Sequence, residues 1–89
     1  MRALVTGAGK RLGRAMALYL ADRGFDVVVH YAGSEDAARA VVSEIVAKGQ
    51  RAQALRADLI VEDDMQSLVP RAVEALDGQL SVLVNNASI

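Results

Sequence analysis

Short apolar stretches alternate along the chain with longer segments of helical periodicity. The stretches at residues 3–5 and 27–29 are runs of apolar side chains, and residues 80–84 are apolar except for Ser81, a pattern that favours strands buried on both faces of a sheet. Residues 51–57 alternate between apolar and polar side chains and predict a weaker strand. The sequence therefore predicts four strands.

Between these strands, apolar side chains recur every three or four residues, as they do on one face of a helix. Gly24 and Gly49 follow the first two periodic segments and predict where these helices end. Pro70 interrupts the third segment, so we expect a bend there or a late helix start near Ser67. The side chains expected to be buried are Leu12, Ala15, Met16, Tyr19 and Leu20 in the first helix, Val41, Val42, Ile45 and Val46 in the second, and Met65, Leu68, Val69, Ala72, Val73 and Leu76 in the third.

The resulting order β-α-β-α-β-α-β predicts an α/β fold with a parallel sheet and right-handed crossovers. We expect the strand order 3-2-1-4, which is the N-terminal half of a Rossmann-type doubly wound sheet. Residues 1–89 would then form one half of a single nucleotide-binding domain. In such folds, ligands bind outside the carboxyl ends of the strands where the strand order reverses. Here that point lies near Gly7 and Asn86.

Composition narrows the classes of function. The net charge of -1 gives no electrostatic reason to expect binding to nucleic acid or to an anionic membrane. The chain has no cysteine, which excludes a disulfide framework and a cysteine-based metal site. No apolar run approaches the ~20 residues of a transmembrane helix, and the N-terminus does not resemble a signal peptide. We expect a cytoplasmic protein with a small-molecule substrate and no metal site.

A glycine-rich loop, Thr6-Gly-Ala-Gly-Lys-Arg-Leu-Gly13, joins the first strand to the first helix. Gly7 and Gly9 would let the backbone turn tightly beside a ligand, and Gly13 would allow the helix to pack close to the strand. Free N–H groups at the helix start favour an anion. The last glycine lies one residue beyond its place in the G-x-G-x-x-G pattern. The glycines alone therefore also fit a plain strand–helix connection.

Three cations, Lys10, Arg11 and Arg14, surround the start of this helix, where the helix dipole disfavours positive charge. They are either solvated surface residues or the counter-charges of a multiply charged anion. Because three occur together, we favour a phosphate-rich ligand and place Lys10 and Arg11 in its site.

The residues after the second strand bear on the choice of cofactor. An NAD site would carry a carboxylate there to hold the ribose 2′-hydroxyl, but residues 30–34 read His-Tyr-Ala-Gly-Ser, and Glu35 is the first acid. With Arg11 close by, a 2′-phosphate fits better, which favours NADP(H) over NAD(H). Ser34 suits a helix N-cap and a phosphate ligand equally well. We interpret His30 as a strand-end residue near the cofactor rather than a catalytic or metal-binding one.

These motifs resemble those of the short-chain dehydrogenase/reductase family. The glycine loop is similar to that family's TGxxxGxG pattern, Asp58-Leu59 to its acidic step after the third strand, and residues 83–87, LVNNA, to its signature after the fourth. Within the family, Arg11, the pair His30-Tyr31 and the ending NNAS look most like pteridine reductases. Ala32-Gly33 departs from that group, which often has a larger basic residue there.

The resemblance implies an NADPH-dependent reductase that transfers hydride to a C=O or C=N bond of a ketone or pteridine-like substrate, and a homo-oligomer, dimer or tetramer, at full length. It also implies the cofactor contacts. These are Gly7, Arg11 and Leu12 at the pyrophosphate and adenosine, Tyr31, Ala32 and Ser34 around the ribose and its phosphate, Ala57, Asp58 and Leu59 around adenine, and Asn86, Ala87 and Ser88 toward the nicotinamide ribose.

The family's catalytic Tyr-x-x-x-Lys motif is not found. Tyr19 and Tyr31 are followed four positions on by Arg23 and Glu35, so no catalytic residue is assigned. Since family members are much longer, we expect a fragment, a truncated product or one piece of a cleaved enzyme, inactive alone. We also expect the strand at 80–84 to be paired by a further segment or another copy. The alternative is a non-catalytic nucleotide-binding or structural module.

Overall fold

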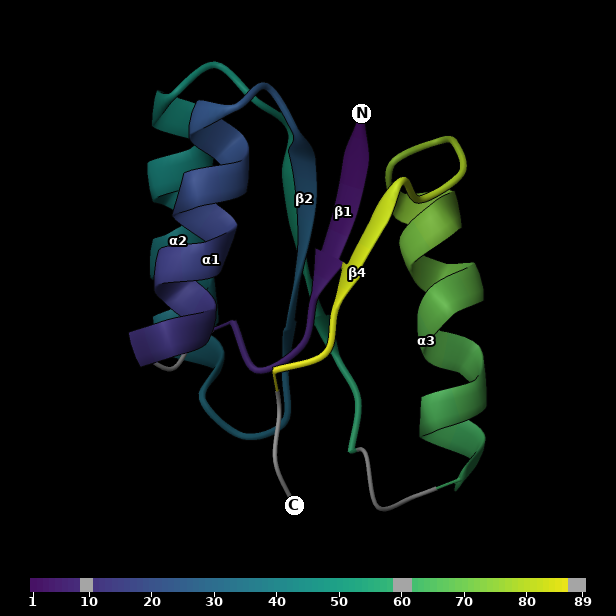
Figure 1. The fold of residues 1–89 in the computed structure, drawn as a ribbon. Coiled ribbons are helices and arrows are strands. Elements are labelled where there is room, and N and C mark those ends of the chain that lie inside the picture. Colours follow the sequence, from purple (N-terminus) through teal and green to yellow (C-terminus); the bar gives the residue numbers. More distant parts are fainter. Residues whose placement is uncertain (9–10, 59–61, 87–89) are drawn as a thin grey trace.

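The computed structural model describes residues 1–8, 11–58 and 62–86, without the side chains of Glu62 and Met65. Strands and helices alternate along the chain (Figure 1). Their bounds are β1 Arg2–Val5, α1 Arg11–Asp22, β2 Asp26–Tyr31, α2 Glu35–Ala47, β3 Ala52–Arg56, α3 Glu62–Ala75 and β4 Val82–Val84.

The four strands form one parallel sheet in the order β3-β2-β1-β4, as the sequence predicts. In the register of β1 with its two neighbours, Val5 lies opposite Val29 of β2 and Val84 of β4. Helices α1 and α2 cover one face of the sheet and α3 covers the other (Figure 1). The carboxyl ends of the parallel strands therefore lie together at one end of the sheet. The strand order reverses between β1 and β4.

The core is divided by the sheet into two clusters, because successive side chains of a strand point to opposite faces. On the side of α1 and α2, Val27 and Val29 pack with Val41 and Ile45. On the side of α3, Val28 packs with Leu4, Leu68, Ala72 and Leu76. Burial on both faces explains why residues 3–5 of β1 and 27–29 of β2 are all apolar.

The buried face of α1 differs from the prediction. Leu12 is 61% exposed and Tyr19 56% exposed, and Ala15 is exposed as well. The buried residues of α1 are the small ones, Gly13, Ala17 and Ala21, and small side chains let the helix backbone approach the strands. Met16 and Leu20 are partly buried and pack against the same core, so the predicted face is confirmed in part.

The predicted stripes of the other helices are confirmed in part. In α2, Val41 and Ile45 are buried, but Val46 is 55% exposed. In α3, Leu68 and Ala72 are buried, but Val69 is 42% exposed, and Leu76, which directly follows α3, is buried. The buried set is therefore narrower than predicted.

The helix ends follow the sequence at their C-termini and depart from it at Pro70. Gly24 and Gly49 both adopt a φ of 91°, the left-handed conformation that ends a helix and favours glycine. Of the two outcomes expected at Pro70, a late start of α3 near Ser67 is wrong, because this helix begins at Glu62 and continues through Pro70. The bend stays a prediction. Pro70 is exposed, so its ring is accommodated on the solvent side.

Candidate functional site

The loop after β1 is held by backbone and ring atoms of a single residue of β2. The Gly7 N–H donates to Nδ1 of His30 over 3.0 Å, and the Ala8 N–H donates to the His30 carbonyl over 3.0 Å. Gly7 has a φ of 65°, a conformation that side chains other than glycine rarely adopt. The loop is thus fixed in a tight turn beside the start of α1.

Gly13 brings α1 against this loop. A Cβ atom at Gly13 would lie 2.3 Å from the Gly7 carbonyl oxygen and 2.7 Å from Nδ2 of Asn86. Real Cβ atoms do not approach other atoms that closely. The close helix–strand packing predicted for Gly13 is therefore confirmed.

The end of β4 is tied to the end of β1 through Thr6. The Asn86 N–H donates to Oγ1 of Thr6 over 2.9 Å, and that hydroxyl lies 3.3 Å from both the Val84 carbonyl and Oδ1 of Asn85. Nδ2 of Asn86 reaches the Gly7 carbonyl at 3.5 Å. The sequence pattern alone did not predict this role of Thr6. The signal that could have indicated it is a hydroxyl side chain directly before the first glycine of the loop.

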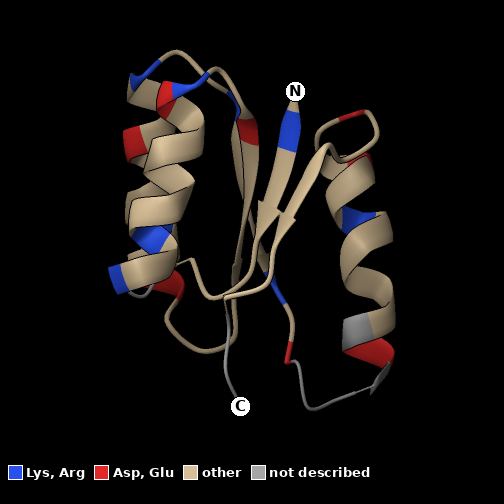
Figure 2. Cartoon of the chain, viewed as in Figure 1, with Lys and Arg blue, Asp and Glu red and all other residues tan. Residues whose placement is uncertain are grey.

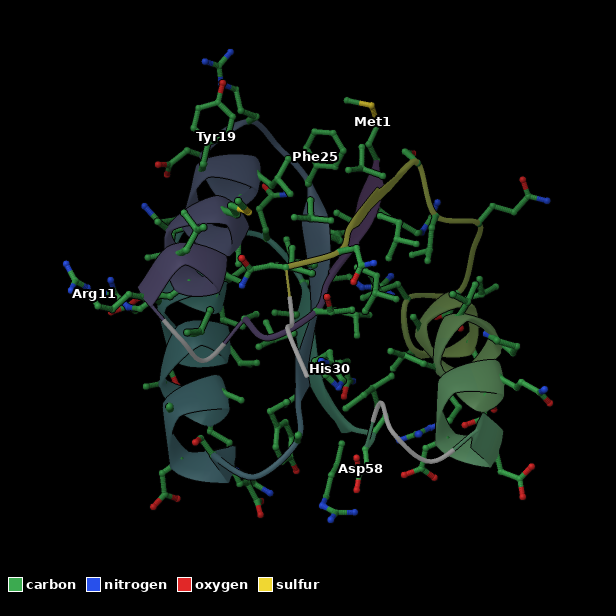
Figure 3. All side chains as sticks on the ribbon, turned by 60° about the horizontal axis from the view of Figure 1, so that its bottom comes forward. Met1, Arg11, Tyr19, Phe25, His30 and Asp58 are labelled. Carbon is green, nitrogen blue, oxygen red and sulfur yellow. The ribbon has the colours of Figure 1, made fainter. Side chains whose placement is uncertain are left out.

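The cations at the start of α1 divide into different environments. Arg14 forms an ion pair with Glu44 of α2, with Nη2 2.7 Å and 2.9 Å from the two carboxylate oxygens. The charge of Arg14 is therefore paired with a carboxylate of the protein, whereas the sequence pattern grouped Arg14 with Lys10 and Arg11 around a bound anion. Arg11 is exposed and extends away from the end of α1 (Figure 3).

The end of β2 leads into the start of α2. Tyr31 is half-buried, Ala32 and Ser34 are exposed, and Ser34 occupies the N-cap position without a side-chain capping hydrogen bond. Its carbonyl accepts from the Ala38 N–H over 3.1 Å. The acids that follow lie in the first helical turn (Figure 2), where Glu35 is paired with Arg39 over 2.6 Å.

The segment after β3 lies beside the same edge. Ala57 is fully buried, so its side chain offers no surface to a ligand, and its carbonyl lies 2.8 Å from Nε2 of His30. The Asp58 N–H donates to Oδ2 of Asp64 over 2.9 Å, and Asp58 itself is half-buried. Figure 3 places Asp58 at the same end of the molecule as His30.

In the described part of the chain, the predicted site residues thus come from the segments that follow the four strands and from the start of α1. Four predicted contacts, at Lys10, Leu59, Ala87 and Ser88, lie outside the described residues. Among the residues described, no group of three acidic or histidine side chains could hold a metal ion. No helix in these ranges is long and apolar enough to cross a membrane.

The fold and the glycine loop define the nucleotide-binding part of a doubly wound α/β protein. The sequence profile of the short chain dehydrogenase family matches residues 1–89. The chain belongs to this family.

Named relatives agree with this assignment. The chain is 47% identical over 87 residues to the 3-oxoacyl-acyl-carrier-protein reductase FabG of Staphylococcus epidermidis, a match that covers 98% of this chain and 35% of the relative. The chain therefore spans about a third of the length of the curated relatives it matches.

Solved structures are similar as well. A short chain dehydrogenase from Burkholderia cenocepacia in complex with NADP superimposes with a TM-score of 0.93 at 45% identity, over 99% of this chain and 36% of that one. FolM alternative dihydrofolate reductase 1 from Brucella suis in complex with NADP gives a TM-score of 0.88 at 39% identity, over 99% and 34%. Both of these similar proteins were solved in complex with NADP.

Proposed function

We propose that this chain is the cofactor-binding half of an NADPH-dependent short-chain reductase. When bound, NADPH supplies the hydride that adds to the carbon of a C=O or C=N bond, while a proton joins the oxygen or nitrogen. The residues described here bind and orient the cofactor. The observation that carries the proposal is the close packing of α1 against the loop after β1, where Gly7 has a φ of 65° and Gly13 lies against the Gly7 carbonyl. This packing lies at the carboxyl ends of the strands, where ligands of such folds bind.

The preference for NADP(H) over NAD(H) rests on the groups around the end of β2. No carboxylate occurs between His30 and Ser34, and the first one, on Glu35, is already bonded to Arg39. Arg11 is exposed at the start of the neighbouring helix, and the Ser34 hydroxyl makes no capping bond. We propose that these two side chains bind the ribose 2′-phosphate, since charge-assisted and hydroxyl hydrogen bonds suit a dianionic phosphate.

The remaining contacts follow the same edge. Gly7 and Leu12, with Lys10, would lie along the pyrophosphate and adenosine, and Tyr31 and Ala32 beside the ribose. Asp58 is the proposed partner of the adenine amino group, positioned by the buried Ala57. Asn86 leads toward the nicotinamide ribose.

Two substrate classes are supported. Similarity to FabG of Staphylococcus epidermidis favours a ketone. Similarity to the FolM protein of Brucella suis, named an alternative dihydrofolate reductase, favours a pteridine-like C=N bond. Arg11 and the pair His30-Tyr31 add to the second reading through their resemblance to pteridine reductases.

The test of the cofactor assignment is calorimetric titration of NADP⁺ and NAD⁺ into the purified protein and its Arg11→Ala variant. Loss of a charged hydrogen bond to the 2′-phosphate should weaken NADP⁺ binding about tenfold or more and leave NAD⁺ binding unchanged. Arg23→Ala is the matched control, because Arg23 lies just beyond the far end of α1, over the ring of Tyr19. If the ratio of NADP⁺ affinity to NAD⁺ affinity were the same in Arg11→Ala as in the unmodified protein, the proposed role of Arg11 would be refuted.

A further inference from the structure

The first carboxylate after β2 is held by an arginine one helical turn further on. Glu35 is the first residue of α2 and directly follows Ser34, which we propose as a ligand of the 2′-phosphate. Its Oε2 atom lies 2.7 Å from Nε of Arg39 and 2.6 Å from Nη2 of the same side chain. Two nitrogens of one guanidinium therefore bind one carboxylate oxygen of Glu35.

The direction of this pair along α2 bears on the cofactor site. In a helix the Cα–Cβ bond tilts toward the N-terminus, so the side chain of a first-turn residue starts out toward the segment that precedes the helix. For Glu35 that segment is residues 31–34, which we propose to surround the ribose. Arg39 lies one turn toward the C-terminus, where residues four apart meet on the helix surface. The ion pair therefore favours a position of the carboxylate along α2 over one beside Ser34.

A free carboxylate beside the ribose would change the choice of cofactor in two ways. It would repel the 2′-phosphate of NADP(H), because like charges at short range raise the energy of the complex. It would also offer an acceptor to the ribose 2′-hydroxyl of NAD(H), which is the role of the acid after the second strand in NAD sites. Both effects would lower the preference for NADP(H).

We propose that Arg39 is a positioning residue that sets cofactor specificity by holding the Glu35 carboxylate away from the ribose. This inference rests on the proposed function, since it assumes a dinucleotide at the carboxyl ends of the strands. The two side chains are 71% exposed for Arg39 and 50% exposed for Glu35, so the pair adds little to stability. Its main effect is on the charge and the acceptors that the start of α2 presents to a ligand.

The same pair also fits a purely structural role. Glu35 followed by Arg39 is the favourable order of an acid and a base four residues apart on a helix, and an acid in the first turn suits the helix dipole. That role alone predicts a small loss of stability in Arg39→Ala and an unchanged ratio of the two cofactor affinities. The ratio of affinities therefore separates the two roles.

The test is calorimetric titration of NADP⁺ and NAD⁺ at about pH 7.5, where a phosphate monoester is largely dianionic. In Arg39→Ala the ratio of NADP⁺ affinity to NAD⁺ affinity should fall about threefold to tenfold, the effect of a solvent-screened charge close to a dianion. Lys48→Ala is the matched control. It removes a cation that pairs with Asp22 over 2.6 Å at the opposite end of α2, and it should leave the ratio unchanged.

A double variant shows whether Arg39 acts through Glu35. In Glu35→Gln the troublesome charge is absent, so adding Arg39→Ala should no longer lower the preference for NADP⁺. The double variant should then have about the same ratio as Glu35→Gln alone. If its ratio is as low as that of Arg39→Ala, Arg39 contacts the phosphate itself and the inference is wrong.

A failure of this inference is distinguishable from a failure of the proposed function. If the unmodified protein prefers NADP⁺ and Arg39→Ala has the same ratio of affinities, the inference is wrong and the proposed function stands. If the unmodified protein binds neither cofactor, or binds NAD⁺ more tightly, the proposed function is wrong and the inference is wrong with it.

Discussion

At the scale of single residues, the site depends on backbone contacts that leave no room for larger side chains. Because Gly13 has no side chain, α1 can lie close to the Gly7 carbonyl and to Asn86. Its role in close packing could be predicted from its place in the glycine loop. The two bonds of the His30 ring could not, because they depend on which segments the fold brings around the end of β2.

The substitution Gly13→Ala tests this crowding. Its Cβ would lie 2.3 Å from the Gly7 carbonyl oxygen, and that oxygen belongs to backbone, which cannot rotate away. We expect a loss of about 2 kcal/mol or more in the free energy of unfolding, as for an overpacked core, measured by urea denaturation.

Gly33→Ala is the matched control for that measurement. No atom lies within 4 Å of a Cβ built at Gly33, so its stability should change by less than about 0.5 kcal/mol. If Gly13→Ala were as stable as Gly33→Ala, the proposed contact between α1 and the loop would be wrong.

At the scale of elements, periodicity identified every helix and strand but not the face that α1 buries. Apolar residues at three- and four-residue spacing predicted a stripe of large side chains. The buried stripe is instead Gly13, Ala17 and Ala21. Hydrophobic periodicity predicts burial of the large apolar side chains, whereas a helix that packs closely on a sheet needs small side chains at the contact. Met16 and Leu20 are partly buried at the rim of this core and line an apolar groove beside Val84.

The two possible faces of α1 make opposite predictions for stability. Ala17 is fully buried and Leu12 is 61% exposed. We expect Ala17→Leu to lower the free energy of unfolding by about 1–3 kcal/mol through overpacking, and Leu12→Gln to change it by less than about 0.5 kcal/mol. Thermal and urea unfolding of both variants would measure this. If Leu12→Gln lowered the free energy of unfolding strongly and Ala17→Leu did not, the buried face of α1 would be the one predicted from periodicity.

At the scale of the whole molecule, the parallel sheet and the strand order 3-2-1-4 could be predicted from the sequence. These features follow from alternating buried strands and helices, and from the chirality of their connections. The cofactor site at the carboxyl ends of the strands stays a prediction. Long-range contacts such as Arg14 with Glu44 could not be predicted, because local pattern does not give the crossing of two helices. The pairing expected for β4 stays a prediction: β4 forms the edge of the described sheet, and its Leu83 is 56% exposed.

The central claim is that the residues at the carboxyl ends of the strands bind NADP(H) in preference to NAD(H). Calorimetric titration of both oxidised cofactors into the unmodified protein at neutral pH tests it most directly. We expect NADP⁺ to bind at least about tenfold more tightly, as a phosphate held by a charged hydrogen bond requires. Equal affinities, tighter binding of NAD⁺, or no binding of either cofactor would contradict the account.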